Sequence, residues 1–259
     1  MNNIKRIVVF GCSYATGEEL LYDELDQELV TIRNVNADPR IFFNAIESNA
    51  TYQEQYTNII KRQYNLAWPA KLAELMNVEC VNFAESGNSM QKMLWQFLNY
   101  KDHLTDTDLV IFSQTKPDRN VFFNDKPSSF QIASILGLIG VGKNGNASKV
   151  IDSNTDKAML KWFTDDRIIW DELMVLMSIG YFKNTHNLWV VPAMRASKYE
   201  LKEYNIMFDE TFKVLQHQLF LGSKTMDDFK GSDSLLWGHP TLEVHEQYAN
   251  YLFAELQRV

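Results

Sequence analysis

The sequence of 259 residues is poor in cysteine, with only Cys12 and Cys80. Two cysteines cannot build the disulfide framework of a small secreted domain, so we expect both to be free thiols. Apolar runs are also short, and none approaches the 18 or so residues that span a bilayer. The segment Ile4–Phe10 is too short for the apolar core of a secretory signal. We therefore expect a cytoplasmic protein that does not bind membranes.

Positive charge is scarce, with 25 lysines and arginines against 33 aspartates and glutamates and a net charge of −8. Without a basic cluster, nucleic acid and anionic membranes are excluded as expected partners. The histidines, cysteines and acids show no metal-ligand spacing, so we expect neither a metal nor a cofactor. The glycines at 140 and 142 lack the spacing of a phosphate-binding loop.

Apolar residues, in contrast, are plentiful at 46%, and 13% of the residues are aromatic. This composition suits a packed core, and the length suits one large domain. We expect residues 1–259 to form a single domain with insertions around 30–62 and 120–154. The sequence does not set an oligomeric state.

The stretch around which the chain is organised lies near its beginning. Four apolar residues, Ile7–Phe10, predict a strand buried on both faces. Gly11 and Gly17 then bound a tight turn that leads into a helix. Ser13 lies in this turn, at the carboxyl end of a central strand, where open α/β sheets bind ligands. The alternative is that Ser13 only caps the following helix.

Strands and helices alternate through the rest of the chain, which predicts a three-layer α/β/α sandwich. The sheet is expected to be mainly parallel, with about five strands, as in flavodoxin-like folds. The predicted strands cover residues 7–10, 78–83, 108–113 and 187–192, with a short edge piece at 219–221. The predicted helices cover residues 16–29, 68–75, 89–100, 155–182, 199–218 and 242–256.

Polar turns follow three of these strands and should meet at one edge of a parallel sheet. The first turn carries Ser13, the second Gly87 and the third Thr115. His239 stands in Gly-His-Pro, directly before the last helix. Acyl transfer needs a hydroxyl, a base and donors aimed at the developing oxyanion. Ser13 could supply the hydroxyl and His239 the base, with backbone N–H groups of Ser13 and Gly87 as donors.

This arrangement resembles the GDSL, or SGNH, hydrolase family. The family carries a serine in an N-terminal Gly-Asp-Ser turn, a glycine after the second strand, an asparagine after the third, and Asp-x-x-His near the C-terminus. Here the matching segments are Gly11-Cys12-Ser13, Asn82 to Gly87, and Gly238-His239-Pro240. The residues in these motifs are most similar to those of divergent SGNH-like proteins of tailed bacteriophages. This resemblance would place the chain in a host cytoplasm or a virion.

The resemblance implies a serine esterase in which Ser13 attacks an ester and His239 is the general base. Two family residues are absent, since Thr115 stands near the place of the asparagine and Leu236 at that of the aspartate. Asn88, Thr115 or Gln114 could serve as the additional oxyanion donor. Asp233, six residues before His239, is the candidate for orienting the imidazole.

Arg119 follows the third strand and is a candidate for binding a substrate anion; an exposed ion pair is the alternative. The expected substrate is a small-molecule or glycan ester, above all a carbohydrate O-acetyl group. A second hypothesis is a catalytically lapsed SGNH-like domain that binds glycans or takes part in virion assembly, which would explain both absences. A third is a flavodoxin-like nucleotide binder with a phosphate at the first turn.

Overall fold

A computed structural model describes residues 3–35, 39–115, 119–123, 130–134, 165–193, 206–230, 234–236 and 238–259. Its strands are β1 (Arg6–Phe10), β2 (Glu79–Asn82), β3 (Asp108–Gln114), β4 (Arg119–Phe123), β5 (Phe130–Ser134) and β6 (Leu188–Pro192). Its α-helices are α1 (Ser13–Thr16), α2 (Gln27–Val35), α3 (Pro39–Glu47), α4 (Ala50–Tyr64), α5 (Trp68–Met76), α6 (Met90–Tyr100), α9 (Asp165–Lys183), α10 (Ile206–Leu219) and α11 (Leu242–Leu256). Short 3₁₀ turns are η1 (Tyr22–Glu24), η2 (Lys101–His103) and η4 (Met226–Asp228).

The main sheet has four parallel strands in the order β2-β1-β3-β6. A parallel bridge between Val190 and Phe220 extends it by one position at the edge where a fifth strand was predicted. The order reverses between β1 and β3, because the chain first runs outward to β2 and then returns past β1. The carboxyl ends of β1 and β3 therefore form a topological switch point, the position at which doubly wound sheets bind their ligands.

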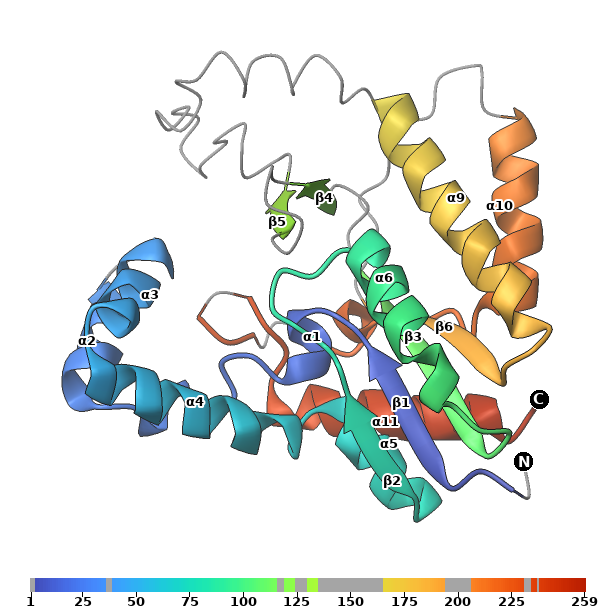
Figure 1. Ribbon diagram of the computed structural model, residues 1–259. Coiled ribbons are helices and arrows are strands. Elements are labelled where there is room, and N and C mark those ends of the chain that lie inside the picture. The colour runs from blue at the N-terminus through green and yellow to red at the C-terminus, as the bar shows by residue number, and fades with distance from the viewer. Residues whose placement is uncertain are drawn as a thin grey trace.

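Helices cover both faces of the sheet, which confirms the predicted three-layer α/β/α architecture. In Figure 1, α6 lies in front of the sheet, whereas α5 and α11 pack side by side behind it. On the side of α6, the helices α9 and α10 pack against each other and against β6. Right-handed crossovers between parallel strands produce this alternation of faces.

The centre of the core is the apolar run of β1. Ile7, Val8, Val9 and Phe10 are each 0% exposed, as expected for a strand covered on both faces. Phe10 stacks on Phe112 of β3, with ring centroids 5.4 Å apart.

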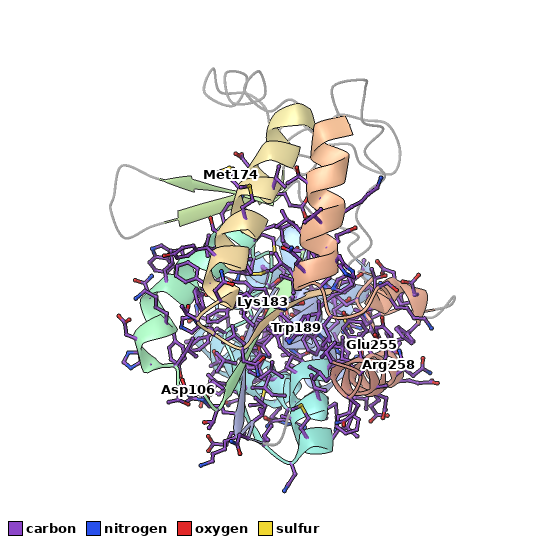
Figure 2. The ribbon with its side chains drawn as sticks, turned by 90° about the vertical axis from the view of Figure 1, so that its right-hand side faces the viewer. Asp106, Met174, Lys183, Trp189, Glu255 and Arg258 are labelled. Carbon is purple, nitrogen blue, oxygen red and sulfur yellow. The ribbon has the colours of Figure 1, made fainter. Side chains whose placement is uncertain are left out.

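At the outer edge of the sheet, Lys183 lies over the ring of Trp189 at 3.0 Å from its centroid (Figure 2). Burial lowers the pKa of Lys183 to about 8.

The helix predicted over residues 16–29 is wrong. The helix that begins at Ser13 ends after one turn, because Gly17 adopts a left-handed conformation with φ of 72°. A Cβ at Gly17 would lie 2.9 Å from the carbonyl oxygen of Gln63, so glycine is required there. Glu19 is also left-handed, with φ of 72°, and the chain becomes helical again only at η1 and α2.

The first insertion, for which the sequence predicts loops and short helices, contains α2, α3 and α4. These helices enclose a small apolar cluster around Tyr22, Leu29 and Phe42. In the second insertion, β4 and β5 form an antiparallel pair, and most of 120–154 lies outside the described residues.

Within the part of the chain that is described, no helix has the length and apolarity needed to cross a membrane. Cys12 and Cys80 are not in a disulfide, as predicted.

Candidate active site

Ser13 lies where β1 gives way to α1, and its position follows from Gly11. A Cβ at Gly11 would lie 2.6 Å from the Cβ of Ala15 and 3.1 Å from that of Ser113, so only glycine lets α1 approach the sheet this closely. Cys12 is the N-cap residue and makes no side-chain cap. Ser13 is the first helical residue and not the N-cap residue, so its hydroxyl does not cap the helix, as the alternative hypothesis proposed. The Ser13 side chain is almost fully buried, at 2% exposed.

The turn that follows β2 is held against the Ser13 turn through one carbonyl group. The oxygen of Gly11 accepts hydrogen bonds from the backbone N–H of Glu85 and from Nδ2 of Asn88, both at 3.0 Å. Asn82 adds a second link, because its Nδ2 donates to the carbonyl oxygen of Ala15 at 2.7 Å. These contacts fix the turn that contains Gly87 beside the start of α1.

The space beside Gly87 is open where its turn meets the start of α1. Its φ is 72°, and an added Cβ would meet no atom within 4 Å. Among the residues that the structure describes, neither the backbone N–H of Gly87 nor that of Ser13 has a hydrogen-bond acceptor. The first N–H groups of a helix lack intrahelical acceptors. Two backbone N–H groups on adjoining turns are therefore left to donate to a bound group.

Asn88, a predicted oxyanion donor, is engaged within the protein. Its Nδ2 donates to the carbonyl oxygen of Gly11 and to Oε1 of Gln96, both at 3.0 Å, and its Oδ1 accepts from the N–H of Ser89. Both amide hydrogens are thus in use, and Asn88 would have to release one acceptor to reach a bound oxyanion.

The end of β3 brings Thr115 and Gln114 to the same edge of the sheet. Thr115 is 2% exposed. Gln114 donates from Nε2 to Oε1 of Glu172 on α9, at 2.5 Å. Burial raises the pKa of Glu172 to about 7, and the hydrogen bond from Gln114 opposes this rise. The Gln114 amide is therefore directed toward α9 and is not a free donor.

The loop before α11 carries His239 and is anchored to α1. Lys230 donates from Nζ to the hydroxyl of Tyr14 at 2.8 Å and also to the carbonyl oxygen of Gly238. The rings of Tyr14 and His239 meet edge to face, with centroids 5.9 Å apart. Tyr14 follows Ser13 directly, so these contacts bring His239 to the helix that begins with the candidate nucleophile.

Two buried glutamates contact the His239 ring, and sequence reasoning missed both. Oε2 of Glu19 lies 2.8 Å from Nδ1, and Oε2 of Glu18 lies 3.5 Å from Nε2. The two carboxylate side chains are only 1% and 4% exposed, respectively. A signal was present in the sequence, because a histidine that lacks the usual aspartate needs another carboxylate, and two follow Gly17.

The remaining predicted site residues are not brought to this cluster by described contacts. Asp233 lies outside the described residues, and Arg119 opens β4 with a side chain that also lies outside them. Leu236 is 53% exposed. Within the described part of the chain, Ser13 and His239 make no hydrogen bond to each other, and no group of acids, histidines and cysteines could hold a metal ion.

A cavity of about 990 Å³ lies beside the site, between α10 and α11, and reaches Gln114 and Pro192 at the ends of β3 and β6. Neither Ser13 nor His239 lines it. The cavity therefore adjoins the carboxyl end of β3 and not Ser13.

No protein-family model matches the sequence, and no curated protein matches it significantly. Solved structures are similar to it at low identity. One is a carbohydrate esterase whose active site shows divergent catalytic and non-catalytic binding functions, at 12% identity and a TM-score of 0.49, covering 98% of this chain and 69% of that one. A second is the psychrotrophic esterase EstA from Pseudoalteromonas sp., inhibited by monoethylphosphonate, at 9% identity and a TM-score of 0.46, covering 98% and 97%. A third is a G-D-S-L family protein from Desulfitobacterium hafniense DCB-2, at 12% identity and a TM-score of 0.40, covering 97% and 99%.

Proposed function

We propose that this protein is an SGNH-type serine esterase, with Ser13 as nucleophile and His239 as general base. The observation that carries the proposal is the pair of unpaired backbone N–H groups, of Ser13 and Gly87, on turns fixed together through the Gly11 carbonyl. Hydrogen-bond donors held rigidly in this way stabilise an oxyanion without reorganising during the reaction. A purely structural turn has no need of two such groups beside a serine hydroxyl.

The reaction follows from these groups. The Ser13 hydroxyl adds to the ester carbonyl while His239 accepts its proton, and the carbonyl oxygen becomes an oxyanion facing the two N–H groups. The alcohol leaves with the proton from His239, and Ser13 keeps the acyl group. Water, deprotonated by His239, then releases the carboxylic acid and restores the hydroxyl. The two side chains are not hydrogen-bonded to each other in the structure, so this step requires the hydroxyl and the imidazole to approach each other.

The substrate we propose is a small ester, above all an O-acetyl group on a carbohydrate. A neutral ester needs no charged recognition site, and the described residues around Ser13 offer hydroxyl, imidazole and backbone N–H groups rather than a free cation. The low exposure of Ser13 favours a small acyl group such as acetyl over a long acyl chain.

The experiment is hydrolysis of p-nitrophenyl acetate by the wild type, Ser13→Ala and the control Ser48→Ala, an exposed serine that follows α3. We expect Ser13→Ala to lose at least 10³-fold in kcat, by analogy with other serine hydrolases. Ser48→Ala should keep the wild-type rate. A fluorophosphonate should add its mass to Ser13 alone, and equal rates for wild type and Ser13→Ala would overturn the proposal.

A second candidate function is a catalytically lapsed domain that binds glycans or a virion partner. It is favoured by the absence of a Ser13–His239 hydrogen bond and by Leu236 at the family aspartate position. It predicts binding of an acetylated glycan with a measurable Kd but no fluorophosphonate labelling. Labelling of Ser13 by the fluorophosphonate in the wild-type protein would exclude a catalytically lapsed domain.

A further inference from the structure

Glu19 lies in the turn after α1, in a backbone conformation that is unfavourable for a residue with a side chain. Its φ of 72° belongs to the left-handed region, which L-residues with a side chain rarely adopt. Such a conformation persists where the surroundings impose it, and it is found often at functional sites. Glycine would remove the cost, so the glutamate side chain needs a reason to be there.

The contact of Glu19 with His239 supplies that reason. Oε2 lies 2.8 Å from Nδ1, and the carboxylate is 1% exposed. A carboxylate oxygen can only accept, so the hydrogen of this bond is on Nδ1. A neutral imidazole with its hydrogen on Nδ1 presents the lone pair of Nε2, which is the form that accepts a proton from a serine.

Glu18 is held differently, although it follows the same turn. Its Oε2 accepts a hydrogen bond from the hydroxyl of Ser86 at 2.5 Å, and its Oε1 accepts one from Tyr22 at 3.4 Å. Its nearest approach to the His239 ring, 3.5 Å from Nε2, forms no hydrogen bond. Glu18 therefore adds negative charge near Nε2, and Glu19 is the carboxylate that is hydrogen-bonded to the ring.

We propose that Glu19 is the positioning residue of His239, supplying from the serine side of the site the carboxylate that Asp-x-x-His motifs supply from the histidine side. The arrangement makes Asp233 unnecessary and explains why Leu236 can occupy the aspartate position. It also couples the base to the nucleophile, because Glu19 and Ser13 belong to one continuous turn in which the N–H of Glu18 donates to the Ser13 carbonyl at 3.3 Å. The inference rests on the proposed function for its kinetic consequence but not for its geometry.

The first arm of the test is spectroscopic and needs no activity. In ¹⁵N-histidine-labelled wild type, the ring of His239, assigned by its absence in His239→Gln, should carry its hydrogen on Nδ1 with a downfield resonance. Glu19→Gln replaces a charged acceptor by a neutral one, which weakens the bond, so this resonance should move upfield or vanish. Glu18→Gln, the matched control, should leave it in place. An unchanged resonance in folded Glu19→Gln would overturn the proposal.

The second arm is kinetic, with p-nitrophenyl acetate as substrate. Glu19→Gln should lower kcat by about 10²–10⁴-fold with little change in KM, as expected when a base populates the wrong tautomer. Glu18→Gln should lose less, and a loss equal to or greater than that of Glu19→Gln would contradict the assignment. If the wild type does not hydrolyse the ester, the proposed function fails while the spectroscopic arm still decides the role of Glu19.

Discussion

Nδ2 of Asn88 lies 3.0 Å from the carbonyl oxygen of Gly11, a contact that joins two turns 77 residues apart in the chain. The side chain of Asn88 is fully buried, and the same carbonyl also accepts the N–H of Glu85. Asn88 thus keeps Gly87 beside Ser13, which is a structural task at the centre of the site. In the proposed reaction, Asn88 would act by holding the turn of Gly87 in place rather than by donating to the oxyanion.

Replacing Asn88 with alanine should therefore reduce stability as well as activity. The change leaves the Gly11 carbonyl and Oε1 of Gln96 each without one donor, and the N–H of Ser89 without its acceptor. We expect the free energy of unfolding to fall by about 3 kcal/mol, the sum of three modest buried hydrogen bonds. Urea denaturation measures the loss. Asn99→Ala on the exposed face of α6 is the control, and a loss as small as that of the control would show that Asn88 does not hold the turn.

Gly11 and Gly87 should both lose stability on addition of a methyl group, but for different physical reasons. In Gly11→Ala the Cβ would lie 2.6 Å from that of Ala15, so the strand or helix must shift, at a cost of about 1–3 kcal/mol. In Gly87→Ala the methyl enters open space, and only the left-handed backbone is penalised, by about 1 kcal/mol.

The activity of Gly87→Ala should nevertheless fall by about tenfold or more, because the methyl group points toward the space beside the free N–H. Thermal unfolding and ester hydrolysis, measured on the same preparations, check the pair. Gly238→Ala matches Gly87→Ala in both its positive φ and its open surroundings. If Gly87→Ala hydrolyses the ester at the wild-type rate, Gly87 does not lie at the reacting group.

The sheet and most helices could be predicted from local patterns. The unbroken apolar run of β1 and the all-buried β3 are typical of central parallel strands. The start of α5 was marked by Pro69 in its first turn, and Ser89 caps α6 by accepting the N–H of Lys92. In each case the residues that determine the element lie within it, so the sequence alone was sufficient.

The Glu18–Glu19 contact with His239 could not be predicted in the same way. Two glutamates after a serine are typical of the first turn of a helix, where they favour the positive end of its dipole. The structure instead ends α1 at Gly17 and buries both carboxylates against a histidine 220 residues away from Glu19. Neither the left-handed conformation of Glu19 nor the packing of the His239 loop by Lys230 leaves a local pattern in the sequence.

Acid should weaken the protein at Asp108, where β3 begins. Burial by itself would raise the pKa of Asp108, but hydrogen bonds from Arg6 and Thr105 outweigh it and lower the pKa. Arg6 donates to both carboxylate oxygens, at 2.8 and 2.6 Å. Because the folded-state pKa is depressed, this stabilisation is present above the unfolded value of about 3.9 and is lost as the pH falls through the folded value.

Asp108→Asn should therefore unfold more easily than the wild type at pH 7, by about 2 kcal/mol, as for a hydrogen bond to a charged group. The difference should begin to shrink below about pH 4, where the unfolded chain takes up a proton at Asp108, and disappear as the pH falls through the lower folded-state pKa. Urea denaturation at several pH values measures both effects. Asp102→Asn, an exposed carboxyl beside Lys101, is the control and should change stability little. A difference that does not vary with pH would contradict the role of the charge.

His245 should make stability depend on pH in a window that begins higher, at about pH 6.5, and extends down toward its folded-state pKa of about 3. The residue is fully buried on α11, and its Nδ1 accepts the backbone N–H of Trp68 at 3.1 Å, which requires the neutral ring. Burial, and secondarily the charge of His239, lowers the pKa of His245 to about 3.

Below the unfolded-state pKa of about 6.5, His245 binds a proton in the unfolded chain but stays neutral in the folded chain. The free energy of unfolding therefore falls by up to about 1.4 kcal/mol per pH unit. In His245→Asn, Oδ1 can still accept from Trp68 but does not titrate, so its stability should depend less steeply on pH in this window. Urea denaturation at half-unit intervals measures the slope, with the exposed His103→Asn as a control that keeps the wild-type slope. Equal slopes for His245→Asn and wild type would mean that the folded protein protonates His245, and that the Trp68 contact does not hold the ring neutral.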